Sequence, residues 1–215
     1  MKKIYGFTLA EVAIVVGLIF LTALLMVPNL VEDNKKIDII AKWKNTYQNI
    51  EYIFSAMTAQ TSETDNAEFQ KASGNDEKAD LLFEMLAPYF RVDKAISNEE
   101  YQTYYLNGSK VKENDDYYTK NLHILNSGKI LGLKWLNTPE SVTDKMPIAI
   151  LSIDLNGLNK PNKWGYDIFG VNIYTNRIEP LGKTNDDYLI KTDCSKKGTG
   201  VACSYFYYIY GGEFN

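Results

Sequence analysis

The N-terminal part of the chain is apolar over a long run. From residue 12 to residue 27 no charged residue occurs, and a single carboxylate, Glu11, stands at the start of the run. At about 1.5 Å of helical rise per residue, an apolar helix over residues 7–30 is long enough to cross a bilayer core of about 30 Å. Lys2 and Lys3 precede this run and favour a cytoplasmic N-terminus. The pattern therefore predicts a transmembrane or assembly helix over residues 7–30.

A second pattern, typical of an amphipathic helix, follows the apolar run. Apolar residues recur at spacings of three and four, and the positions between them are mostly polar. This stripe consists of Ile40, Trp43, Tyr47, Ile50, Phe54 and Met57. It predicts that the helix continues over residues 31–59. Because the stripe is shorter than three heptads, we expect it to pack on the chain's own globular domain and not to form a coiled coil.

Residues 60–215 are predicted to form one globular domain of the α+β class. A polar stretch over 58–76 indicates a loop, and an apolar pattern over 77–90 indicates a short helix. The tyrosine-rich tail at 205–210 has high β propensity and is expected to close the sheet edge or to pack on a neighbouring subunit. Strands are predicted at 121–125, 130–135, 148–153 and 168–174. The expected fold is a long N-terminal helix packed against an antiparallel sheet of about four strands.

Composition argues against several classes of protein. The 215 residues carry a formal net charge of −4, which argues against a general nucleic-acid binder, because such proteins present a basic face. His123 is the only histidine, and the chain contains no P-loop and no GxGxxG motif. No Ser-His-Asp set is present either. We therefore predict that the chain is not an enzyme.

The two cysteines, Cys194 and Cys203, lie close together near the C-terminus. They form no CxxC motif and have no histidine nearby, which argues against a zinc site. If the domain is exported, a disulfide is expected. If the protein is cytosolic, the two residues are instead expected to be free thiols.

An oxygen-rich loop lies between the third and fourth predicted strands. Its oxygen-bearing side chains are those of Asp154, Asn156, Asn162 and Asp167, and glycines interrupt them. Carboxylate and amide oxygens are the ligands that Ca²⁺ prefers, although the EF-hand pattern is absent. Asn and Asp also form turns by hydrogen bonding to nearby backbone. The loop therefore has two interpretations, a calcium site or a set of turns without metal.

The first eleven or so residues carry a specific motif, Lys-Lys-Ile-Tyr-Gly-Phe-Thr-Leu-Ala-Glu-Val. It resembles the leader and cleavage site of type IV pilins and of type II secretion pseudopilins. The resemblance covers about thirty residues and includes Pro28, at a place where the family often has a proline. It implies that residues 1–6 are a leader, that a prepilin peptidase cuts between Gly6 and Phe7, and that Phe7 is then N-methylated. It also suggests a pilin-like globular domain, more loosely.

The spacing of Phe7 and Glu11 gives the motif a physical meaning. Residues four apart share a helix face, so the new amine of Phe7 would lie beside the Glu11 carboxylate. In a filament, Glu11 of one subunit could neutralise the Phe7 amine of the next and set the register of assembly. The alternative is that Glu11 lies in a lipid headgroup zone and needs no partner. Pro28 is predicted to kink the helix, or else to mark the exit from a membrane.

Together these features predict a structural subunit of a type IV pilus-like filament, processed by prepilin peptidase and polymerised through its N-terminal helix. Two alternatives remain, a pseudopilin of a type II secretion system, and a minor pilin that presents an adhesive or DNA-binding tip. The expected partners are copies of the chain, other pilins, the peptidase and an inner-membrane assembly machinery. The expected location is the bacterial inner membrane, as a single-pass protein, and then a periplasmic or extracellular filament.

Overall fold

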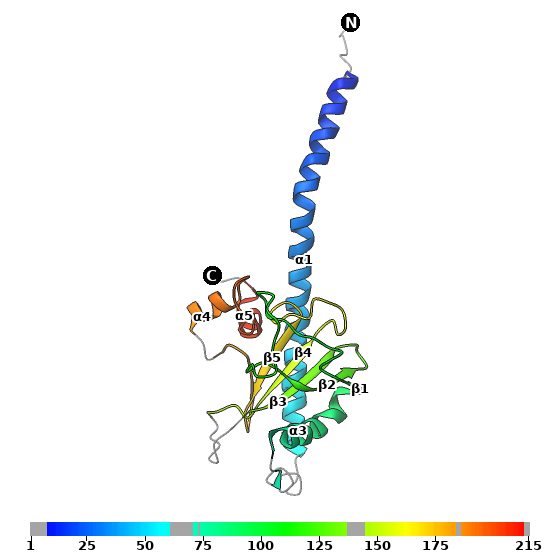
Figure 1. Cartoon of the computed structure of the whole chain (residues 1–215). Coiled ribbons are helices and arrows are strands. Elements are labelled where there is room, and N and C mark those ends of the chain that lie inside the picture. The colour runs from blue at the N-terminus through cyan, green and yellow to red at the C-terminus, as the bar shows by residue number, and fades with distance from the viewer. Residues whose placement is uncertain (1–7, 61–70, 73, 137–144, 184–185, 213–215) are drawn as a thin grey trace. The chain divides into compact units, whose positions relative to one another are not determined.

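The computed structural model describes residues 8–60, 71–72, 74–136, 145–183 and 186–212, without the side chains of residues 23 and 25–33. Within these residues the chain is of the α+β class. Its elements (Figure 1) are α1 (Leu9–Gln60), α3 (Asn75–Phe90), β1 (Val92–Ile96), β2 (Lys120–Leu125), β3 (Ile130–Trp135), β4 (Ala149–Asp154), β5 (Ile168–Ile173), β6 (Ile178–Pro180), α4 (Asp187–Asp193) and α5 (Cys203–Tyr210).

The chain divides into two compact units. They are an N-terminal segment, Met1–Asp38, and a sheet domain, Ile39–Asn215. The division falls inside α1, so the sheet domain contains only the part of that helix from Ile39 onwards.

The sheet domain is built on a six-stranded antiparallel meander. Its strands pair in chain order, β1-β2-β3-β4-β5-β6, and every neighbouring pair is antiparallel. At the centre Leu133 lies opposite Leu151, which in turn lies opposite Val171. The hairpin predicted between 121–125 and 130–135 is present, and its turn closes with the Gly128 N–H donating to the Leu125 carbonyl at 2.8 Å. Gly128 has φ +80°, a left-handed conformation that favours glycine.

One face of the sheet is covered by α1 and α3. All six residues of the predicted apolar stripe, from Ile40 to Met57, are buried. Trp43 is fully buried, its indole N–H donates to the Ser204 carbonyl at 2.7 Å, and its ring stacks on Phe169 of β5 with centroids 5.0 Å apart. In Figure 1 this part of α1 passes behind the strands. From Trp43 to Met57 the stripe thus forms the core of the sheet domain together with the inward-facing residues of β3, β4 and β5.

Among the described residues, the opposite face of the sheet is covered mainly by irregular segments. Trp164 and Tyr101 come from such segments and are buried against this face, in one cluster with Ile150 and Ile168. The two faces alternate along each strand, because successive side chains of a strand point to opposite sides. This second, loop-covered face carries the oxygen-rich loop at one end.

The predicted pilin-like fold is wrong, although the class is α+β as expected. The sheet has six strands and not about four. The strand β1 was not predicted, because it carries the exposed residues Asp93 and Lys94 and lacks a regular apolar alternation. The tail predicted as a strand is the helix α5, whose residues Cys203 and Phe206 are buried. Tertiary packing therefore overrides the β propensity of its tyrosines.

The predicted pass through an inner membrane is also overturned. Among the residues that the structure describes, no helix has a stretch that is both long enough and apolar enough to cross a bilayer. The polar residues Asn34, Lys35 and Lys36 follow further along α1.

The burial of the Trp43 indole predicts how substitutions at this position change the free energy of unfolding. Trp43→Ala should lower the free energy of unfolding by about 3–5 kcal/mol, because it leaves a cavity between α1 and β5. Trp43→Phe should cost less, since it keeps most of the packing but leaves the Ser204 carbonyl without its donor, at about 1–3 kcal/mol. Urea unfolding measures both changes. Tyr52→Ala, at a side chain of α1 that is 72% exposed, is the matched control and should change stability by less than about 0.5 kcal/mol. Equal losses at Trp43 and Tyr52 would contradict this packing.

Candidate functional site

The predicted processing site is only partly within the described residues. Gly6 and Phe7 lie outside them, so the cleavage and methylation predictions stay predictions. Pro28 falls within the bounds of α1, and its side chain is not described. Of the residues singled out in the N-terminal segment, Glu11 is the one whose side chain lies within the described part of the chain.

Glu11 forms a reciprocal cap with Thr8 at the start of α1. The Thr8 backbone N–H and the Thr8 hydroxyl both donate to Glu11 Oε2 at 2.8 Å. In return the Glu11 backbone N–H donates to the Thr8 hydroxyl oxygen at 3.3 Å. This is a capping box, which satisfies backbone N–H groups that have no partner within the helix. The carboxylate thus helps to start the helix.

These hydrogen bonds also fix the charge of Glu11. The Thr8 backbone N–H, and then the Thr8 hydroxyl, lower the pKa of the Glu11 carboxyl below its ordinary value. The carboxylate is therefore ionised near neutral pH. The sequence held the signal for this cap, because Thr-Leu-Ala-Glu matches the pattern of a Ser or Thr followed three residues later by Glu. Sequence reasoning paired Glu11 with the Phe7 amine or placed it in a headgroup zone, and in both cases missed its hydrogen bonds to Thr8.

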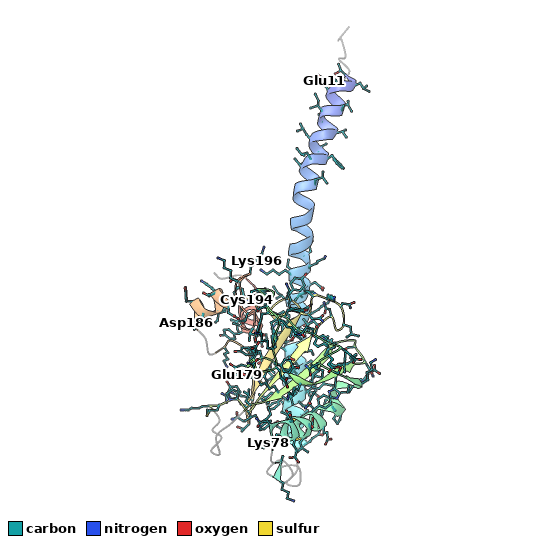
Figure 2. The ribbon with its side chains drawn as sticks, in the orientation of Figure 1. Glu11, Lys78, Glu179, Asp186, Cys194 and Lys196 are labelled. Carbon is teal, nitrogen blue, oxygen red and sulfur yellow. A yellow bond between two sulfur atoms is a disulfide. The ribbon has the colours of Figure 1, made fainter. Side chains whose placement is uncertain are left out.

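The N-terminal segment exposes apolar side chains on every side of α1 (Figure 2). Each of ten large apolar side chains is at least about half exposed in this structure, and Leu9 is 90% exposed. Successive residues of a helix are turned by about 100°, so a run of consecutive apolar residues leaves no polar face. The ten are Leu9, Val12, Ile14, Val15, Val16, Leu18, Ile19, Phe20, Leu21 and Leu24.

The oxygen-rich loop brings its four predicted residues together. Asp154 Oδ1 accepts hydrogen bonds from the backbone N–H groups of Asn156 and Gly157, both at 2.9 Å. Asp167 Oδ2 accepts from the Asn162 backbone N–H at 3.0 Å and from the Asn156 side-chain amide at 3.1 Å. Asn156 therefore bridges the two carboxylates. These bonds are the turn-forming contacts that one interpretation of the loop required.

The two carboxylates of this loop are buried close together. Asp154 is 2% exposed and Asp167 is 1% exposed, and within the described residues neither forms an ion pair with a basic side chain. Burial, together with the nearby charge of Asp167, raises the pKa of Asp154 to about 7, against the lowering effect of the hydrogen bond from the Tyr101 hydroxyl. Burial likewise raises the pKa of Asp167. Near neutral pH the pair can therefore bind either a proton or a cation.

Two amide oxygens of the loop are left without a donor. Asn156 Oδ1 and Asn162 Oδ1 are buried and accept no hydrogen bond. With the carboxylates of Asp154 and Asp167 they make a set of oxygen donors suited to a hard cation such as Ca²⁺. Only two of the residues are acidic, and the described part of the chain holds no group of three or more His, Cys, Asp or Glu placed to bind a metal. Backbone carbonyls or water would have to complete the usual six to eight ligands.

The predicted disulfide between Cys194 and Cys203 is present, with an S–S distance of 1.99 Å. It joins the end of α4 to the start of α5, and not to a strand as expected. Asp193 reinforces the same loop, since its carboxylate accepts from the Thr199 backbone N–H at 2.8 Å and from the Ala202 backbone N–H at 2.7 Å. The disulfide and this carboxylate together hold the loop in one conformation.

The buried pair predicts an unusual dependence of stability on pH. The pKa of Asp154 is about 7 in the folded chain and about 3.9 when unfolded. Between these values the folded state binds more protons, so the contribution of Asp154 to stability falls as pH rises from about 4 to about 7. Asp154→Asn should remove this fall, because an amide keeps the acceptor for Asn156 and Gly157 and does not ionise. Denaturation in calcium-free buffer across this range measures the difference, and parallel curves for the two proteins would contradict it.

The calcium hypothesis makes a separate prediction for the same loop. A bound Ca²⁺ would offset the repulsion between Asp154 and Asp167, so calcium should raise the melting temperature of the wild-type chain at pH 8. Asp154→Asn should reduce that rise, while Asp187→Asn, at an exposed carboxylate of α4, should not. An unchanged melting temperature on addition of calcium would leave the loop with its turn-forming role alone.

Comparison with known proteins adds no relative on which to rest a function. No family model matches this chain, and neither a curated protein nor a solved structure matches it.

Proposed function

We propose that this chain is a structural subunit of a type IV pilus-like filament, cut between Gly6 and Phe7 and assembled through the apolar part of α1. The leader motif supports the processing step, since it resembles the site that a prepilin peptidase cuts. The partners in assembly are other copies of the same chain. The proposal assigns no catalytic role to any residue.

The observation that carries the proposal is the apolar surface of the N-terminal segment. Its ten large apolar side chains are exposed around the whole helix, and this is a surface that isolated proteins rarely leave in water. Burying one such side chain fully contributes about 1.5–3 kcal/mol. Copies of the same helix, packed side by side, would bury these residues against each other without any second type of partner.

The charge of Glu11 supports a defined register for that packing. Both Thr8 donors bind Oε2 of Glu11, and no described residue bonds to Oε1 of the ionised carboxylate, which is open to a further partner. Cleavage after Gly6 would create a positive amine on Phe7, one helical turn before Glu11. In a bundle of apolar helices this amine would be the natural partner for Glu11 of a neighbouring copy. Without such a pair, each buried charge would oppose assembly.

Replacement of Glu11 tests the proposal. Glu11→Ala should still be cut after Gly6 but should reduce filament yield roughly 100-fold or more, because an unpaired buried amine costs about 3–5 kcal/mol. Electron microscopy and sedimentation of sheared filaments measure the yield, and mass spectrometry reports the cut. Thr8→Val separates the two roles of Glu11, since it removes the side-chain half of the cap but keeps the carboxylate, and it should assemble.

Glu51→Ala is the matched control, at an exposed carboxylate of α1 within the sheet domain. It should be cut and should assemble as the wild type does. Normal filaments from Glu11→Ala would contradict the proposal.

A further inference from the structure

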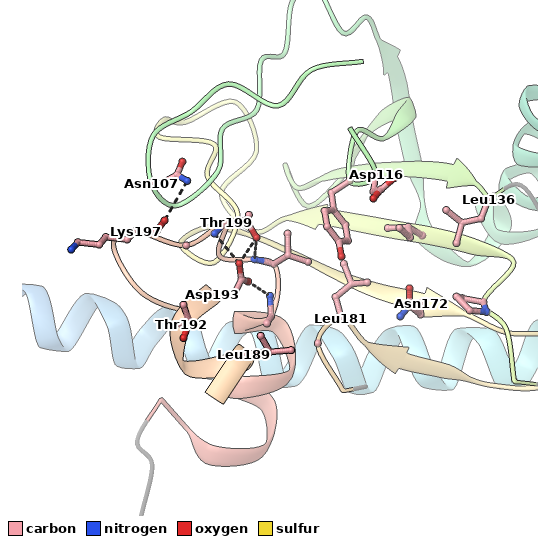
Figure 3. A pocket seen from close by; sticks show the side chains of 17 residues that line it. Asn107, Asp116, Leu136, Asn172, Leu181, Leu189, Thr192, Asp193, Lys197 and Thr199 are labelled. Atoms are coloured by element: carbon pink, nitrogen blue, oxygen red, sulfur yellow. Dashed lines mark hydrogen bonds between the residues drawn. The ribbon is translucent and has the colours of Figure 1, made fainter. Parts of the chain in front are cut away.

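An open groove of about 670 Å³ lies on the loop-covered face of the sheet domain (Figure 3). Ile150 of β4 and Asn172 of β5, which are cross-strand neighbours, line the groove along the sheet. Asp116 and Tyr117 line it from the segment before β2, and Lys197 lines it from the disulfide loop. The volume is within the range of small-molecule sites, which is about 300–1,000 Å³.

The wall formed by the disulfide loop is held in place before any ligand binds. The Cys194–Cys203 disulfide closes the loop, and the carboxylate of Asp193 accepts from the backbone N–H groups of Thr199 and Ala202 (Figure 3). A preformed wall lowers the cost of ordering the site when a ligand enters. Asp193 is therefore occupied in holding the wall, and the groove must recognise a ligand through other groups.

Three polar side chains in the groove are available for that purpose. Within the described part of the chain, the hydroxyl of Tyr117, the side-chain amide of Asn172 and the carboxylate of Asp116 form no hydrogen bond. The polar atoms of these three groups are not fully buried, so they face solvent in the groove. Burial, and then the charges of Asp116 and Asp193, raise the pKa of the Tyr117 hydroxyl, which therefore stays protonated and can donate.

The chemistry of the lining disfavours anions and wholly apolar ligands. Two carboxylates, Asp116 and Asp193, face a single ammonium group, Lys197, so the groove does not favour an anion such as a phosphate. A wholly apolar ligand would cover the polar groups of Tyr117 and Asn172 without giving them partners, which is unfavourable. A suitable ligand must both donate and accept hydrogen bonds and must also offer an apolar surface to Leu189, whose side chain is 50% exposed.

We propose that this groove binds a short neutral saccharide. Sugar hydroxyl groups both donate and accept, so they match the Tyr117 hydroxyl, the Asn172 amide and the Asp116 carboxylate. The C–H face of a sugar ring is apolar and suits Leu189 of α4, a lining side chain that is 50% exposed. This site is independent of the N-terminal segment, so its failure would leave the filament proposal unaffected.

Binding of simple sugars to the full chain tests the proposal. The probes are maltotriose, lactose and chitobiose, each at millimolar concentration, with binding measured by calorimetry and by ligand-observed NMR. At least one probe should bind the wild-type chain, and Tyr117→Phe and Asn172→Ala should each weaken that binding by about tenfold or more. Tyr117→Phe keeps the ring that packs edge-on against Trp164 with centroids 6.1 Å apart, so it should fold normally.

Tyr166→Phe is the matched control, at a partly exposed tyrosine outside the groove. It should bind the sugar as the wild type does. The proposal is overturned if none of the three sugars binds, or if Tyr117→Phe binds the best of them as tightly as the wild-type chain.

Discussion

The burial of Trp43 is the contact on which the sheet domain depends. The indole stacks on Phe169 of β5 and donates to the carbonyl of Ser204 in α5. Residues far apart in the sequence therefore meet at one side chain, which ties α1 to the sheet and to the C-terminal helix. The disulfide between Cys194 and Cys203 fixes the loop before α5 and so supports the same contact from the other side. Hydrophobic burial supplies most of the stability, and the single hydrogen bond fixes the position of the ring.

Features with a strong local signal could be predicted from the sequence. The apolar stripe around Trp43 and Tyr47 was visible because helical periodicity and burial coincide there. The β2–β3 hairpin was visible because Gly128 and its neighbours signal a turn between two apolar runs. The disulfide followed from the close spacing of the two cysteines, given export. In each case a few neighbouring residues contain the whole explanation.

Features that depend on distant residues were missed. The helix α5 has the composition of a strand, and only its packing on Phe169 and on Tyr47 of α1 explains why it is helical. The strand β1 is an edge strand with an exposed middle, so its sequence lacks the usual alternation. The groove lined by Tyr117 and Asn172 is assembled from many separate stretches of the chain, and no local pattern indicates it. Long-range contacts of this kind leave little trace in a single sequence.

The two units of the chain pose opposite physical problems. In the sheet domain the difficulty is buried charge, since Asp154 and Asp167 lie together with no basic partner among the described residues. Hydrogen bonds from neighbouring backbone groups offset only part of the cost. In the N-terminal segment the difficulty is exposed apolar surface, for which the segment itself provides no cover. The proposed filament solves the second problem by packing copies of the helix together.

The most direct test of this account is the N-terminal residue of the chain in its assembled form. Filaments sheared from cells that produce the protein should consist mainly of this chain, and mass spectrometry should find it beginning at an N-methylated Phe7. A chain that still begins at Met1 in such filaments, or filaments that lack the chain altogether, would contradict the account.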